Sequence, residues 1–136
     1  MYILKTNKST SLPQLLLFYD TEAEIIHLDD RQIHRFKIVS SRFYRYKNKK
    51  YQLQHEYTFT SLDDFWDYAV SLTSSKKKLY IISHNQHYDF FISNAYYHLK
   101  KRGFTLKEFS FDSNIFFATF RDNRNNNNIS RHIQLL

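Results

Sequence analysis

Apolar and polar residues follow the period of a β-strand through the first half of the chain. The segment Leu15–Ile26 opens with a continuous apolar run, which is typical of a strand covered on both faces. Arg35–Tyr46 and Tyr51–Phe59 read as two further strands joined by the turn-like Lys47–Lys50. The alternation in the third segment predicts one face that carries its apolar side chains: Tyr51, Leu53, Tyr57 and Phe59.

The period then changes to that of a helix. An amphipathic helix is predicted after Ser61, which with Asp64 three residues later resembles a capping box. Leu79–Ser83 is a short apolar strand, and a second helix is expected from about Tyr88 to Arg102. Gly103, the only glycine, follows it as a C-terminal cap would. The stripe expected on that second helix comprises Phe91, Ala95 and Leu99.

The last predicted strands, Ile115–Phe120 and Ile129–Leu136, flank the asparagine run Asn125–Asn128. The order of elements is three strands, a helix, a strand, a helix and then one or two strands. A meander followed by β-α-β crossovers predicts an α/β domain with a mixed sheet and helices packed on it. The 136 residues fit a single domain. Because no helix follows the last strand, we expect a domain truncated at its C-terminus.

The charge balance favours an anionic partner. Lys and Arg number 20 against 13 Asp and Glu, which gives a formal charge of +7 and a pI near 9.5. Such a field attracts nucleic acid above all, and otherwise an anionic membrane surface. Lys76–Lys78 and Asn125–Asn128 are expected to be solvated connections. The absence of cysteine excludes disulfides and thiolate metal sites. With neither a membrane-length apolar run nor a secretory signal, we expect a cytoplasmic location and no membrane partner.

Two acidic residues stand at the end of the first apolar strand. Asp20 and Glu22 are at positions i and i+2, which share one face of a strand. Neighbouring carboxylates repel one another unless a cation lies between them, and Mg²⁺ prefers oxygen ligands of this kind. The alternative is an ordinary strand end that faces solvent.

A second polar stretch, Ser83–Asp89, follows the short apolar strand and opens the second predicted helix. The C-terminal end of a parallel strand faces the crevice where ligands bind in sheets of this class. Asp89 would also suit the positive end of the helix dipole, which is the structural alternative. His84 and His87 are not expected to bind a transition metal, because no third His or Cys completes a ligand pattern.

Together the two stretches resemble the motifs of a known family. Asp20-Thr21-Glu22 resembles the first motif of the DEDD 3′–5′ exonucleases, and His84-Asn85-x-x-Tyr88-Asp89 is similar to their second motif. The stretch from Leu79 to Phe104 is especially similar to its counterpart in family B DNA polymerases, including the protein-primed phage type. The resemblance spans Leu15 to Leu136 and implies a ribonuclease H-like mixed sheet.

The resemblance implies a two-metal exonuclease that proofreads DNA from the 3′ end, with Mg²⁺ or Mn²⁺ ions about 4 Å apart. Asp20 would bridge both ions, Glu22 would bind the water-activating ion and Asp89 would serve the second. The implied partners are single-stranded DNA or a primer-template 3′ end, and a polymerase domain that follows in the same chain. The residues implied to contact nucleic acid are Thr21, His84, Asn85 and Tyr88.

One motif of the family has no match. The third motif places a Tyr or His shortly before a final Asp on a later helix. Asp112 and Asp122 are the last acids of the chain, and both are expected in strands or turns. The single domain 1–136 is therefore expected to lack the C-terminal part that carries the fourth ligand, and to be weakly active or inactive alone.

Two other classes of function stay open. A non-catalytic nucleic-acid-binding module with the same fold would hold DNA equally well in EDTA. A structural or protein-interaction domain with incidental acids would show no salt-dependent DNA binding. A true ribonuclease H is disfavoured, because there the second acid comes from a helix instead of from the first strand.

Overall fold

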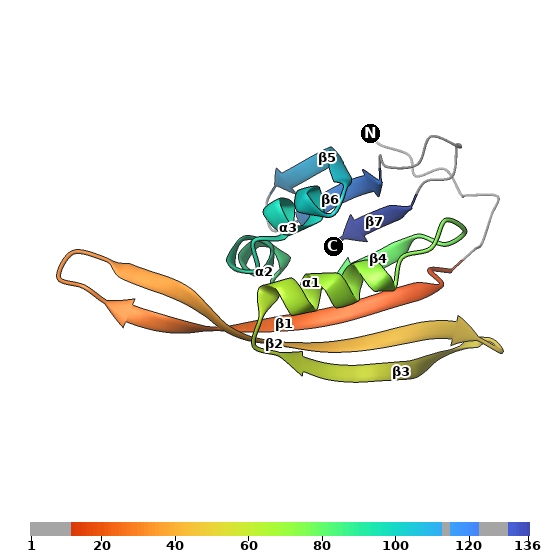
Figure 1. Cartoon of the computed structure of the whole chain (residues 1–136), viewed down its shortest axis with the longest axis horizontal. Helices are drawn as coiled ribbons and strands as arrows, with labels where there is room; N and C mark the ends of the chain where they lie inside the picture. The colour runs from red at the N-terminus through yellow and green to blue at the C-terminus, as the bar shows by residue number, and fades with distance from the viewer. Residues whose placement is uncertain (1–11, 113–114, 123–130) are drawn as a thin grey trace, which may run out of the picture.

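The computed structural model describes residues 12–112, 115–122 and 131–136. They form a mixed seven-stranded sheet in the order β3-β2-β1-β4-β7-β6-β5, together with three helices (Figure 1). The predicted α/β class, with a mixed sheet and helices packed on it, is confirmed at this level. The predicted asparagine-rich turn and residues 129–130 of the last predicted strand lie outside the described residues.

The first three strands form the predicted antiparallel meander. They are β1 (Leu15–His27), β2 (Gln32–Lys47) and β3 (Lys50–Phe59). The far ends of β1 and β2 extend beyond the rest of the sheet as a two-stranded hairpin (Figure 1). All three strands were predicted, and β2 begins three residues earlier than expected.

The prediction of one apolar face for β3 is wrong. A register shift between Phe43 and Tyr44 introduces a bulge in the β2–β3 ladder. A bulge adds one residue to a strand and so reverses the faces beyond it. Tyr57 therefore packs on Tyr68 of the helix layer, whereas Tyr51 lines a hollow with Tyr44 on the other face.

The elements after the meander follow prediction closely. Helix α1 (Leu62–Ser71) begins at Ser61, whose side chain accepts a hydrogen bond from the backbone N–H of Asp64. Its inward face buries Phe65, Trp66 and Ala69. Strand β4 (Leu79–Ile82) then pairs in parallel with β1.

The second predicted helix is instead two helices, α2 (Gln86–Ile92) and α3 (Ala95–Lys101). The break falls at Asn94, which has a left-handed φ of 52°, a conformation that Asn tolerates better than most residues. The backbone carbonyl of Ser93 accepts a hydrogen bond from Trp66 Nε1 at 2.9 Å. Phe91 is 59% exposed and lies outside the buried stripe that was predicted. Gly103, with φ 92°, ends α3 as predicted.

The last three strands are β5 (Phe104–Asp112), β6 (Ile115–Asp122) and β7 (His132–Leu135). Strand β5 was not predicted. It forms an antiparallel pair with β6, so two helices and an extra strand pair separate β4 from β7 in the chain. A simple β-α-β-α-β ending was therefore wrong, although β7 does lie parallel to β4.

All three helices cover the same face of the sheet. Both helical crossovers, from β3 to β4 and from β4 to β5, run in the same direction across the strand order, which places their helices on one side. Alternate residues of β1 are buried under the helices, beginning with Leu15 and Leu17, while Leu16 and Phe18 face the other way. The largest fully buried side chains of this core include Trp66, Phe43, Phe65, Phe104 and Phe120.

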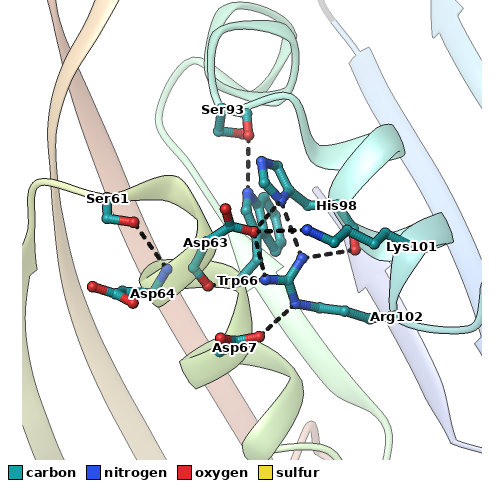
Figure 2. Close-up of polar contacts among 9 residues, drawn as sticks. All are labelled: Ser61, Asp63, Asp64, Trp66, Asp67, Ser93, His98, Lys101 and Arg102. Atoms are coloured by element: carbon teal, nitrogen blue, oxygen red, sulfur yellow. Dashed lines mark hydrogen bonds and ion pairs between the residues drawn. The ribbon is translucent and has the colours of Figure 1, made fainter.

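Polar contacts join α1 to α3 at the rim of this core (Figure 2). The guanidinium of Arg102 donates to Asp67 at 2.8 Å and to Asp63 at 3.1 Å. Arg102 also lies 3.1 Å from the ring of His98, which is 6% exposed. Because one planar cation contacts two of the three acidic residues of α1, it ties the two helices together.

Candidate active site at the ends of strands β1 and β4

The two motif stretches meet at one end of the sheet. Strands β1 and β4 are parallel neighbours, and their last pair is Phe18 with Ile82. Asp20 lies two residues beyond that pair on β1, and Ser83–Asp89 follow it from β4. Helix α2 packs on β1 and carries Asp89 back to this end of the sheet. The two motif stretches therefore lie at the same end of the sheet.

Asp89 is a buried carboxylate with two hydroxyl partners. Its side chain is 2% exposed. One carboxylate oxygen accepts a hydrogen bond from the Thr21 hydroxyl and the other from the Ser83 hydroxyl. Burying a charged group is costly unless donors or a cation offset the loss of water. Here a residue of β1 and a residue after β4 supply neutral donors to the first turn of α2.

Tyr19 and Gln86 form a second buried contact beside Asp89. The Tyr19 hydroxyl donates a short hydrogen bond to the Gln86 side-chain carbonyl. The Gln86 amide donates to the backbone carbonyls of Ile81 at 3.1 Å and Leu136 at 2.9 Å. Burial first, and the charge of Asp89 second, raise the pKa of Tyr19 well above its usual value. The phenol is therefore a neutral donor that holds α2 against β1 and β4.

Asp20 and Glu22 lie on the opposite face of β1 from Thr21. Both are exposed, whereas Tyr19 and Thr21 are buried towards the helices. The two carboxylates share a face, as their spacing predicts. Asp20 lines a hollow of about 520 Å³ on the helix-free face. That hollow is also lined by Phe18, Arg42, Glu56, Ile82 and His84.

The residues implied to contact nucleic acid are divided between two hollows. His84 shares the first hollow with Asp20. Asn85 and Tyr88 line a different one, of about 470 Å³, beside Phe91. The Tyr88 hydroxyl lies 2.9 Å from His34 Nδ1 of the long hairpin. Thr21 is 8% exposed, and its hydroxyl donates a hydrogen bond to Asp89. It therefore holds Asp89 on the helix side of β1.

The three carboxylates implied as metal ligands approach β1 from two sides: Asp20 and Glu22 lie on its exposed face, and Asp89 lies on the helix side. Asp89 reaches the residue between the other two, but from the helix side of the strand. Across the described parts of the chain, no group of three or more His, Asp or Glu side chains is placed to hold a metal ion. Asp20 and Glu22 offer carboxylate oxygens, the ligand type that Mg²⁺ prefers, on one face of β1.

The hydrogen bonds from Thr21 and Ser83 to Asp89 were not predicted from the sequence. The available signal was a polar residue at an inward position of a strand whose other inward residues are apolar. A buried polar group needs a hydrogen-bond partner. A hydroxyl at this position therefore indicates a polar group opposite, and Asp89 is that group.

The last two acids of the chain lie at strand ends. Asp112 ends β5, and Asp122 ends β6, so neither stands on a helix, as expected. Asp122 is 6% exposed and lies 2.6 Å from the Arg131 guanidinium.

No protein-family model, curated protein or solved structure matches the chain. Among the helices of the described residues, none has the length and apolar character needed to cross a membrane. The assignment of function therefore depends on the residues and their geometry.

Proposed function

We propose that the chain is a nucleic-acid-processing domain of the 3′–5′ exonuclease type, with a ribonuclease H-like fold. The observation that carries the proposal is the meeting of Asp20-Thr21-Glu22 with Ser83–Asp89 at the ends of parallel neighbours β1 and β4. The two stretches are separated by residues 23–82 of the chain. Their meeting places both at the end of the strands where ligands bind in open α/β sheets.

The strand order supports the same proposal. The meander β3-β2-β1, followed by the parallel strands β4 and β7, agrees with the sheet that the family resemblance implies. The substrate would be single-stranded DNA or the 3′ end of a primer-template. A polymerase domain in the same protein is the corresponding partner.

Asp20 and Glu22 are the residues that would hold a divalent ion, Mg²⁺ or Mn²⁺. When bound, such an ion supplies positive charge to the scissile phosphate and to the attacking water. Asp89 would reach it only after leaving the hydroxyls of Thr21 and Ser83. We therefore expect turnover by residues 1–136 to be slow.

A second candidate is a non-catalytic nucleic-acid-binding module. It is favoured by the two hydroxyl bonds that satisfy both carboxylate oxygens of Asp89. A carboxylate held in that way stabilises the fold whether or not a metal binds.

Digestion of a single strand labelled at its 5′ end tests the proposal. With millimolar Mn²⁺ we expect slow shortening from the 3′ end, lost in EDTA and in the double variant Asp20→Asn, Glu22→Gln. The matched control is Asp29→Asn, Asp30→Asn, which removes the same charge at the exposed hairpin tip. The control should digest at the wild-type rate.

Two results would count against an exonuclease. If the strand is bound but stays full length with Mn²⁺, the second candidate is favoured. If digestion continues undiminished in the Asp20→Asn, Glu22→Gln variant, the carboxylates of β1 are not part of the active site.

A further inference from the structure

A concentrated positive surface lies at the end of the sheet remote from Asp20. Its residues come from the β2–β3 turn and from the connection between α1 and β4. Both segments lie at the right-hand end of the sheet in Figure 1. We call this surface the basic end; its seven residues are Arg45, Lys47, Lys49, Lys50, Lys76, Lys77 and Lys78.

The basic end accounts for the whole net charge of the chain. The other 13 Lys and Arg are matched by 13 Asp and Glu, and the formal charge is +7. The two stretches 43–55 and 68–88, which contain all seven cations, include no acidic residue. Among the described residues, none of the seven forms an ion pair with a carboxylate. Their charge is therefore available to an external anion.

A hollow of about 480 Å³ opens between the two segments. Arg45 from β2 and Lys76 and Lys77 from the α1–β4 connection contribute its cations. The hydroxyls of Ser71 and Thr73 also line it, but they donate to backbone carbonyls of α1 at 2.5 and 2.6 Å. The attraction for an anion consequently comes from the three cations.

The β2–β3 turn keeps lysine where other residues would favour the fold. Asn48 and Lys49 both have left-handed φ angles, 53° and 65°. A two-residue turn of this kind prefers glycine at its second position, because a side chain there is strained. Lys47 and Lys50 also face each other across the ladder, where like charges repel. Strain and repulsion at one exposed turn are the pattern expected of a functional surface.

Aromatic side chains lie at the same end of the sheet, on the helix-free face opposite the hollow. The rings of Tyr46 and Tyr51 are 4.9 Å apart, and Tyr51 is 37% exposed. Lys78 Nζ lies 5.6 Å from the ring centre of Tyr80 on the helix-free face. Proteins that bind single strands combine a cationic surface with aromatic rings on which bases stack. The combination favours a single-stranded nucleic acid over an acidic protein.

We propose that the basic end binds the phosphates of single-stranded nucleic acid at a distance from the candidate active site. This inference rests on nucleic acid as the ligand of the proposed function, but it does not require catalysis. Arg45 pairs with Leu15, and Asp20 lies five residues further along β1, about 17 Å away. At the phosphate spacing of one strand in B-DNA, that distance corresponds to about five nucleotides.

Binding of a fluorescent oligothymidylate of about 20 nucleotides tests the proposal, in EDTA so that no digestion occurs. The test variant is Arg45→Gln, Lys76→Gln, Lys77→Gln. Its matched control, Lys37→Gln, Lys100→Gln, Lys107→Gln, loses the same charge elsewhere on the surface. We expect the test variant to bind at least about tenfold more weakly at low salt. The magnitude of the slope of its log affinity against log salt concentration should decrease by about 2. The control variant should keep the wild-type slope.

Lys49→Gly is a second variant, which tests the proposal even if the triple variant does not fold. It should raise the melting temperature, because glycine relieves the left-handed strain, and should weaken DNA binding at the same time. Equal weakening of the test and control triple variants would overturn the proposal, as would unchanged binding in both. Loss of binding to phosphatidylserine vesicles without loss of DNA binding would assign the basic end to membranes instead. Absent digestion in the Mn²⁺ assay leaves these outcomes unaffected.

Discussion

Asp89 is the residue at which the catalytic and the non-catalytic accounts of the site diverge. As a ligand shared with Asp20 and Glu22 it would have to reach the helix-free face of β1. As a structural carboxylate it would be buried and hydrogen-bonded. In the structure it is 2% exposed and bonded to Thr21 and Ser83. The position of Asp89 in the first turn of α2 was predictable from its motif. Its burial was not, because its partner Thr21 is 68 residues away in the chain.

Removing the Thr21 hydroxyl measures how strongly Asp89 is held. Thr21→Val keeps the side-chain shape but leaves one buried carboxylate oxygen without its donor. A hydrogen bond to a charged group contributes about 1.5–3 kcal/mol, so we expect the free energy of unfolding to fall by about 2 kcal/mol. Urea unfolding measures the change. The matched control, Thr58→Val on exposed β3, should have little effect. A Thr21→Val loss no larger than the control would mean that Asp89 does not depend on this bond.

At the scale of elements, the sequence predicts those boundaries that a local sequence pattern determines. The continuous apolar run placed β1, the capping serine placed the start of α1, and the single glycine placed the end of α3. The break between α2 and α3 has a distant cause in part, since the Ser93 carbonyl accepts a hydrogen bond from Trp66 of another helix.

Bulges account for the remaining errors in the strands. The register shift near Phe43 turned Tyr51 and Tyr57 to opposite faces of β3. A second shift, between Leu106 and Glu108, breaks the alternation of β5, which was not predicted. A pattern search with a fixed period of two loses a strand at such a point.

The contact between α1 and α3 should respond to pH through His98. Burial, and then the neighbouring Arg102 charge, lower the pKa of His98, which Lys101 also lowers and Asp63 and Asp67 partly raise. The unfolded chain therefore takes up a proton at His98 more readily than the folded chain. The contribution of neutral His98 to the free energy of unfolding is fully present above the ordinary histidine pKa of about 6.5. It is lost as the pH falls below that value.

We expect the melting temperature to decrease as the pH is lowered from about 7.5 to about 5.5, a range above the titration of ordinary carboxylates. His98→Gln should lose less stability over this range than the wild type. Some dependence should remain, because burial lowers the pKa of His132 as well. A His98→Gln variant with the full wild-type slope would show that the α1–α3 contact does not contribute.

At the scale of the whole molecule, the two proposed functional regions lie at opposite ends of β1. The motif residues gather at one end and the net positive charge at the other, about 17 Å apart along the strand. The charge excess was evident in the composition, and the anionic partner that it favours stays a prediction. Its concentration at one end was missed, although the two acid-free stretches 43–55 and 68–88 were a readable signal.

The most direct test of the account is to map a bound single strand on the full chain by amide chemical-shift changes, with Mg²⁺ present. We predict changes at the β2–β3 turn and the α1–β4 connection, and a second group around Asp20 and His84. An oligonucleotide of two or three residues should be too short to produce both groups at once, since the two ends are separated by about five phosphates. Changes confined to the outer surface of α3, or no changes at low salt, would contradict the account.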